Sequence, residues 1–186
     1  MDLSPTAYVI LGMVSREARS GYEIKALVDN TTRFFWAASY GQIYPELKRL
    51  SEAGLVEGID APRGERKRTV YAITVDGEEE LRAWLRQPPQ TFEMREEGLL
   101  KLFFAGVLEP AEAAATLREM HAYRRGLAER LRALEPMAEQ KVKEKMDPFP
   151  LMVLQGGIEF NEWFAGWCER MERRLLEPVR PRERSS

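Results

Sequence analysis

The sequence predicts a mainly α-helical protein with one small β-hairpin. Apolar residues recur at spacings of three and four along most of the 186-residue chain, as on one face of an α-helix. Two alternating, β-rich stretches, residues 56–59 and 69–73, flank a turn that contains Pro and Gly. Two consecutive prolines at residues 88–89 then separate two helical halves. We expect one domain over residues 1–87, a second over 91–177 and a disordered tail over 178–186.

The composition indicates a globular protein without bulk affinity for nucleic acid. Hydrophobic residues make up 44% of the chain, which is enough for a core, but the formal net charge is −2. Any DNA-binding surface must therefore be a local cluster of cations. The single cysteine, Cys168, excludes an internal disulfide, and no apolar run is long enough to span a membrane. Together these features predict a cytoplasmic protein.

The most informative stretch predicts a helix from about residue 41 to residue 53. Ile43, Leu47 and Leu50 are spaced i, i+4 and i+7, which places them on one buried face. Gly54 follows and can end the helix, because glycine adopts the left-handed conformation without strain.

Two signals for the start of this helix compete. Ser39 and Gln42 fit a capping box, whereas Gly41 could itself be the cap. Either start leaves Pro45 near the first turn, where its missing N–H does least harm.

The remaining faces of this helix carry side chains that suit the major groove of DNA. Glutamine can bond the edge of an adenine, and Lys, Arg and Tyr hydroxyl groups can bind phosphates. An ordinary amphipathic helix with a solvated polar face is the alternative interpretation. The candidate DNA-binding residues are Ser39, Tyr40, Gln42, Tyr44, Lys48 and Arg49.

Two shorter helices are predicted before this one. Ser4 and Pro5 open the first, since the fixed φ of proline suits the first helical position. Ser20 and Glu23 form a capping box that opens the second. The aromatic residues 34–36 follow, and we expect them to wedge the connection into the core, with a stacking platform for a flat ligand as the alternative.

The turn between the two strands is strongly basic. Residues 63–68 carry four cations and one anion, a local charge of +3 in a net-acidic chain. Such a loop suits contact with phosphates or the minor groove, although a merely solvated hairpin tip is the alternative. Three helices followed by a basic hairpin is the order of a winged helix-turn-helix. The candidate residues of this wing are Arg63, Arg66, Lys67 and Arg68.

These motifs, which extend over roughly residues 3–86, resemble the PadR family of transcriptional regulators. The resemblance implies that residues 41–53 form the recognition helix and residues 63–68 the wing tip. It also implies a helical C-terminal domain that dimerises the protein, since the last helix is similar to that of longer PadR-like proteins. The motifs are Leu3-Ser4-Pro5, Ile10-Leu11-Gly12, Ser20-Gly21-Tyr22-Glu23-Ile24, Gly41-Gln42-Ile43-Tyr44-Pro45-Glu46-Leu47-Lys48-Arg49-Leu50, Gly54-Leu55-Val56 and Tyr71-Ala72-Ile73-Thr74.

The second half is predicted to contain three helices. We expect them over residues 94–106, from residue 109 to beyond 138, and over 151–176. Two recognition helices held about 34 Å apart by a dimer would read a two-fold operator that one helix binds weakly. The candidate dimerisation residues are Leu127, Leu131, Leu134, Ile158, Phe160, Phe164, Met171 and Leu175.

The resemblance implies a homodimeric repressor that binds double-stranded DNA. It also implies that a small aromatic or drug-like effector releases the protein from DNA. Such an effector must bind more tightly to the conformation with one spacing between the two recognition helices. Equal affinity for both conformations would not shift the equilibrium between them. Candidate pocket walls are Trp36, Trp163 and Trp167, with core packing as the alternative for all three. A third interpretation is a regulator that has no ligand and is controlled by its own abundance.

Nothing in the sequence indicates an enzyme. His121 and Cys168 each stand alone, so neither a metal site nor a histidine-containing triad can form within one chain, and no cofactor is expected. The rival function is a winged-helix adaptor for another protein, which the acidic balance favours and the basic turn opposes. Steep salt dependence of DNA binding would separate the two.

Overall fold

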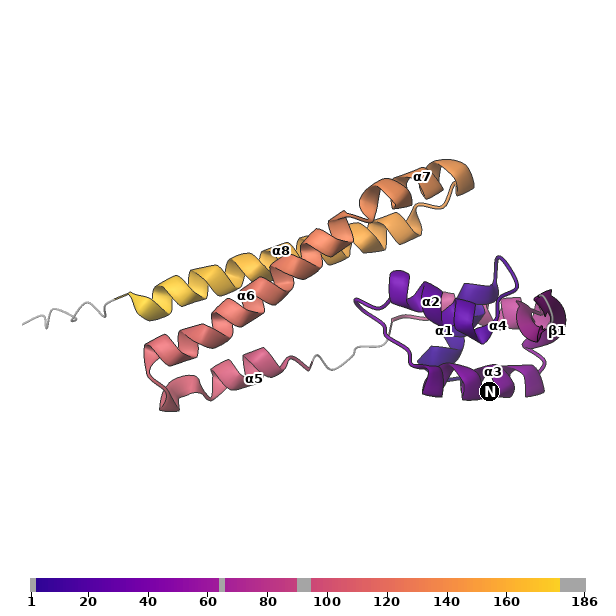
Figure 1. The fold of residues 1–186 in the computed structure, drawn as a ribbon, viewed down its shortest axis with the longest axis horizontal. Coiled ribbons are helices and arrows are strands. Elements are labelled where there is room, and N and C mark those ends of the chain that lie inside the picture. Colours follow the sequence, from indigo (N-terminus) through magenta and orange to yellow (C-terminus); the bar gives the residue numbers. More distant parts are fainter. Residues whose placement is uncertain (1–2, 64–65, 90–94, 178–186) are drawn as a thin grey trace, which may run out of the picture. The chain divides into compact units, whose positions relative to one another are not determined.

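The computed structural model describes residues 3–63, 66–89 and 95–177, without the side chains of residues 61–63, 66 and 67. The chain divides into two compact units, Met1–Thr91 and Phe92–Ser186 (Figure 1). The fold is mainly α-helical with one antiparallel hairpin, as predicted. No helix in the described part is long and apolar enough to cross a membrane. The expected tail over residues 178–186 lies outside the described residues.

The first unit has three helices, a hairpin and a fourth helix. Antiparallel pairing of the two strands places Val56 opposite Ile73. Ser4 caps the first helix by accepting the Ala7 N–H at 3.2 Å. The elements are α1 (Pro5–Val14), α2 (Gly21–Asn30), α3 (Tyr40–Glu52), β1 (Val56–Arg63), β2 (Arg66–Ile73) and α4 (Val75–Leu85).

Ser39 is the N-cap of α3, which resolves the ambiguity between the two start signals. The Gln42 side-chain oxygen accepts the Ser39 backbone N–H at 2.9 Å. Pro45 consequently lies inside the helix rather than in its first turn, and the Gly41 carbonyl lacks its usual helical donor. At the other end, Gly54 has φ 72°, the left-handed conformation expected of it.

The core of the first unit forms where the first three helices meet. Ile10, Ile24 and Leu47 are fully buried there, and burial of such a side chain contributes roughly 1.5–3 kcal/mol. The hairpin joins this core through an isolated β-bridge between Arg19 and Tyr71. Their backbones exchange two hydrogen bonds, of 3.0 and 2.8 Å, so the segment before α2 is tied to β2.

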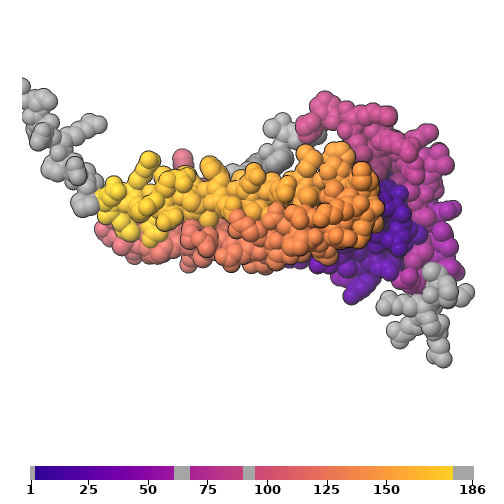
Figure 2. All heavy atoms as spheres, turned by 90° about the horizontal axis from the view of Figure 1, so that it is seen from above, coloured from indigo at the N-terminus to yellow at the C-terminus, as the bar shows by residue number. Residues whose placement is uncertain are grey.

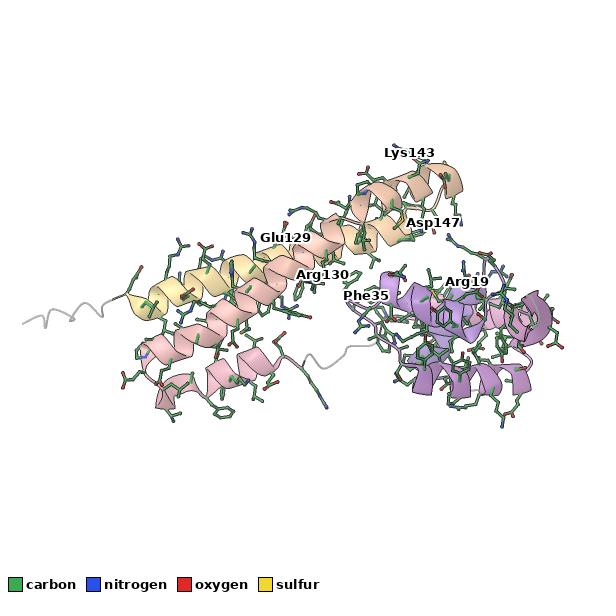
Figure 3. The ribbon with its side chains drawn as sticks, in the orientation of Figure 1. Arg19, Phe35, Glu129, Arg130, Lys143 and Asp147 are labelled. Atoms are coloured by element: carbon green, nitrogen blue, oxygen red, sulfur yellow. The ribbon has the colours of Figure 1, made fainter. Side chains whose placement is uncertain are left out.

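One prediction about the apolar residues of this unit is wrong. Phe35 and Trp36 do not wedge into the core but are 55% and 39% exposed (Figure 3). The chain turns tightly here, with the Trp36 N–H donating to the Thr32 carbonyl at 2.6 Å. On α4, Leu85 is exposed, and Trp84 is only half covered by stacking on the ring of α1 residue Tyr8.

The second unit is built on two long helices, α6 (Pro110–Arg132) and α8 (Phe149–Leu176). They run side by side in opposite directions along nearly their whole length (Figures 1 and 2). Their shared core includes Leu117 and Met120 from α6 and Phe164 and Cys168 from α8. The shorter elements are α5 (Glu97–Phe103), the 3-10 helix η1 (Ala105–Val107) and α7 (Glu135–Lys145).

The long helix predicted from residue 109 to beyond 138 is two helices. It begins as expected after Glu109, but α6 ends at Arg132 and Leu134 is the N-cap of α7. Pro136 explains the break, because it has no N–H to donate to the Arg132 carbonyl and its ring would clash there. Leu134 therefore does not continue the apolar stripe of α6.

Candidate nucleic-acid interface

The exposed face of α3 carries most of the predicted DNA-binding residues. While the apolar face of this helix is buried, Tyr40 and Tyr44 are 44% and 50% exposed. The side chains of Lys48 and Arg49 are more than half exposed. These four residues are spread over successive turns, so α3 presents two phenols and two cations to solvent.

Both cations have an acidic neighbour on the same helix. Lys48 Nζ lies 3.8 Å from Glu52 Oε1, and Arg49 Nη1 lies 3.1 Å from Glu46 Oε1. Glu46 is largely buried and also accepts the Ser4 hydroxyl at 2.8 Å, which ties α3 to the start of α1. The Lys48–Glu52 pair is exposed on both sides and contributes about 0–1 kcal/mol, so a phosphate oxygen can replace the Glu52 carboxylate.

Gln42 is less available than its position on α3 suggests. Its side-chain oxygen accepts both the Ser39 N–H at 2.9 Å and the Ser39 hydroxyl at 3.1 Å. A bidentate bond to an adenine edge needs both groups of the amide, and it would therefore open the N-cap of α3. In the structure Ser39 and Gln42 act as capping residues, and only the amide N–H groups remain to face a ligand.

The two tyrosines form a stacked pair that rests on α2. Their ring centroids are 6.2 Å apart and their planes differ by 23°. Lys25 Nζ lies 5.5 Å from the centroid of Tyr40. A Cβ built on Gly21, the first residue of α2, would lie only 2.7 Å from Cε1 of Tyr44. Sequence reasoning missed both contacts, because neither follows from helical spacing.

The hairpin brings the basic residues of the wing together at its tip. Arg63 lies opposite Arg66 and Pro62 opposite Lys67 in the strand register. The side chains of Arg63, Arg66 and Lys67 lie outside the described residues, so only their place on the backbone is established. That place adjoins the turn of the hairpin, at the end remote from α3.

Arg68, predicted to be a wing residue, has a partner within the first unit. Its Nη1 lies 2.7 Å from Glu23 Oε1, so it ties the hairpin to the start of α2. The pKa of Glu23 is lowered from 4.5 to about 2, mainly by the Ser20 backbone N–H, then by the Ser20 hydroxyl and by Arg68. The capping box of α2 and the base of the wing thus share one carboxylate.

The three tryptophans proposed as pocket walls are divided between the two units. Trp36 belongs to the first unit, whereas Trp163 and Trp167 belong to α8 in the second. Trp163 is 58% exposed, and Trp167 packs edge-on against Phe164 with centroids 5.5 Å apart. An apolar hollow in the second unit is lined by residues of α5, η1 and α6, and no tryptophan lines it.

Several predicted dimerisation residues belong to the core of their own unit. Leu131, Ile158 and Phe164 are buried within the second unit, so they are unavailable to a second chain. Phe160 and Leu175 are exposed on α8. The remaining three, Leu127, Leu134 and Met171, are half-buried.

Arg124, which interrupts the apolar stripe of α6, is satisfied within its own unit. It pairs with Glu96 at the N-cap of α5 and donates to the Asn161 side-chain oxygen at 3.1 Å. Its guanidinium also lies 4.5 Å from the centroid of Phe164. One arginine thus joins α5, α6 and α8.

Cys168 is buried in the second unit. Burial raises the pKa of the Cys168 thiol, which favours the neutral form and agrees with a packing role. Within the described ranges, no three His, Cys, Asp or Glu side chains gather as a metal site would require.

Comparison with known proteins identifies both units. Residues 10–83 match the Transcriptional regulator PadR-like family, and residues 94–175 match the family described as Virulence activator alpha C-term. The negative transcriptional regulator PadR of Bacillus subtilis is 29% identical over 168 residues, which are 87% of this chain and 92% of that protein.

Two crystal structures of Bacillus subtilis PadR match nearly the whole chain. The complex with operator DNA covers 94% of this chain and 99% of that one, with a TM-score of 0.82 and 26% identity. The complex with p-coumaric acid covers 95% and 100%, with a TM-score of 0.72 and 25% identity. The family suggested by the sequence motifs is confirmed for the first unit: residues 10–83 form a domain of the PadR-like family of transcriptional regulators.

Proposed function

We propose that this protein is a homodimeric repressor that inserts α3 into the major groove of operator DNA. The observation that carries the proposal is the outward face of α3, where Tyr40, Tyr44, Lys48 and Arg49 are exposed on a helix whose other face is buried. Hydroxyl groups and cations of this kind fix a helix on phosphates and base edges. The similarity to Bacillus subtilis PadR bound to operator DNA supports this docking. Such a role places the protein in the cytoplasm.

The wing contributes phosphate contacts that do not depend on the DNA sequence. The register places Arg63, Arg66 and Lys67 at the tip of the hairpin, where their charge can reach phosphates. Arg68 is left out of this set, because its partner is Glu23. We assign Ser39 and Gln42 to the cap of α3 rather than to base recognition.

A stripe of exposed apolar residues on α8 is the candidate dimer face. It replaces the buried residues Leu131, Ile158 and Phe164 in that role. A second copy of the chain is the partner we propose, because a two-fold operator requires two recognition helices. Contiguous exposed apolar residues mark interaction surfaces. The stripe consists of Phe149, Met152, Val153, Phe160 and Trp163, with Gly156 open between them.

A small aromatic effector is the ligand we propose for regulation. The support is the similarity to Bacillus subtilis PadR in complex with p-coumaric acid. Of the candidate tryptophans in the second unit, Trp163 has its ring exposed within the proposed dimer stripe, so a ligand stacked on it would lie at the dimer interface. Trp167 is assigned to packing, because its ring joins the core around Phe164.

Fluorescence anisotropy tests the proposed function directly. DNA from upstream of the protein's own gene is compared with a scrambled duplex at two salt concentrations. We expect tight binding to the native fragment that weakens steeply as salt rises. Lys48→Ala should weaken binding, whereas Arg82→Ala, which removes an exposed cation from α4, should not. Equal, weak binding to both duplexes would favour the rival function of a winged-helix adaptor for another protein.

A further inference from the structure

Gly21 occupies a position where space, rather than backbone conformation, excludes a side chain. It is buried at the first position of α2, and among the described glycines only Gly54 has a positive φ. A Cβ on Gly21 would lie 2.7 Å from Cε1 and 2.9 Å from Cζ of Tyr44. Real Cβ atoms do not approach other atoms so closely, so the Tyr44 ring lies directly against the bare backbone of α2.

Lys25 supports the other ring from the same helix. It follows Gly21 by four residues and therefore lies on the same face of α2. Its Nζ is 5.5 Å from the centroid of Tyr40, and its side chain is only 14% exposed. An ion pair with Asp29 on the next turn holds the ammonium group in place. The cation is thus a support beneath the ring rather than a free charge on the surface.

Each of the two tyrosines is consequently packed on one side and open to solvent on the other. Each ring has one side against α2 or the other ring, while about half of each residue remains open to solvent. An ordered pair loses less side-chain entropy on binding than two free side chains do. The open parts of the two rings suit apolar contact with thymine methyl groups.

We propose that Gly21 and Lys25 are positioning residues, which hold the Tyr40–Tyr44 pair in one orientation so that α2 sets the sequence preference of α3. This inference rests on the proposed binding of DNA by α3. A displaced ring loses its match to particular bases but leaves the cations of α3 and the wing in place. Displacement therefore reduces preference for the native site more than it reduces affinity for DNA in general.

Gly21→Ala is the variant that tests the role of the bare backbone. We expect it to fold, because the colliding atoms belong to the outer part of a ring that can rotate away, and alanine suits a helix. Affinity for the native fragment should fall roughly tenfold, a change equivalent to loss of one good contact, with little change for the scrambled duplex. Gly12→Ala is the matched control, since nothing lies within 4 Å of that position in α1.

A double-mutant cycle separates positioning from a general effect on the helix. Once Tyr44→Ala has removed the ring, adding Gly21→Ala should cause no further loss of affinity for the native fragment. An equal loss with and without the ring would show that Gly21 acts on α2 itself, and would overturn the proposal. Lys25→Met keeps the length of the side chain and should reduce the preference by about two- to threefold, in line with a weak cation–π contact.

A measurement without DNA keeps the inference separate from the proposed function. Fluorine NMR of protein labelled with 3-fluorotyrosine reports each ring, and Tyr44→Phe identifies the Tyr44 signal. Gly21→Ala should shift that signal, whereas Gly12→Ala should leave it unchanged. An unmoved signal would refute the contact itself. If the wild-type protein shows no preference for the native fragment over the scrambled duplex, the DNA-binding role is refuted, even if the signal moves. If the signal moves in Gly21→Ala but the variant's preference for the native fragment is unchanged, only the positioning role is refuted.

Discussion

The two units of this chain bury their apolar residues in different ways. In the first unit, side chains from α1, α2, α3 and β1 meet in one core whose members are almost completely buried. The second unit has a smaller core between α6 and α8 and leaves large apolar side chains in solvent, with Phe103 81% and Val107 91% exposed. The first unit thus buries its core within one chain, whereas the second has the exposed apolar surfaces that an interaction domain needs.

The largest effect is expected from a cavity in the closed core. Leu47→Ala should lower the free energy of unfolding of the first unit by about 2–5 kcal/mol, because the fully buried side chain leaves a cavity at the centre of α3. Urea unfolding of the full chain measures the loss. Leu85→Ala, at an exposed position of α4, is the control and should change little. Similar losses in the two variants would mean that the unit is not closed as described.

A charge on the open face of the second unit should affect assembly rather than folding. Trp163→Glu should raise the dissociation constant of the dimer about 100-fold, or ~2.7 kcal/mol, because it places a carboxylate in the apolar stripe of α8. Sedimentation equilibrium measures the constant. Gln155→Glu adds the same charge to an exposed position of α8 outside the stripe and should leave it unchanged. Dimers unaffected by Trp163→Glu would exclude this stripe as the interface.

Arg124 tests whether the second unit depends on its ion pair. Arg124→Met should destabilise this unit by about 1–3 kcal/mol, because Glu96 keeps its charge and loses its partner at a partly buried site. Thermal unfolding followed by circular dichroism measures the change. Adding Glu96→Gln removes the unpaired charge and should restore part of the stability. If the double variant is no more stable than Arg124→Met, packing rather than charge explains the loss.

Acid should reveal a smaller electrostatic contribution in the first unit. The folded state lowers the pKa of Glu23 from 4.5 to about 2, so its ionised form stabilises the fold above pH 4.5. This contribution is lost as pH falls from 4.5 towards 2. Because the side chain is more than a third exposed, solvent screening keeps the effect below about 1 kcal/mol. Denaturant unfolding of wild type and Glu23→Gln between pH 6 and pH 2.5 should show converging stabilities, and parallel curves would contradict the assignment.

The fold of the first unit was predictable because local signals agree with one another. Ser4, Ser20 and Ser39 mark three helix starts, and the structure uses all three as caps. Gly54 ends α3 by a backbone conformation that few other residues adopt. Each of these signals acts within about four residues, which is the range over which sequence patterns specify structure.

The failed predictions concern contacts between segments that are distant in sequence. Hydrophobicity alone suggested that Phe35 and Trp36 are buried, but a loop turn determines which side of the chain faces the core. The pair of Arg68 and Glu23, 45 residues apart, was missed, because no local pattern predicts such a contact. Ile158 was expected to bind a second chain but is buried within its own chain. An apolar helix face does not by itself indicate whether the same chain or a second chain packs against it.

Gly77 has a consequence for the genetics of this regulator. It is buried in the first turn of α4, and a Cβ there would collide with the Leu55 carbonyl oxygen, which already accepts the Thr74 N–H at 3.1 Å. A backbone atom held in this way cannot rotate aside as the Tyr44 ring can. Gly77→Ala should therefore push α4 away from the junction of α3 and β1, and we expect it to behave as a temperature-sensitive allele whose target genes escape repression when the cells are warmed.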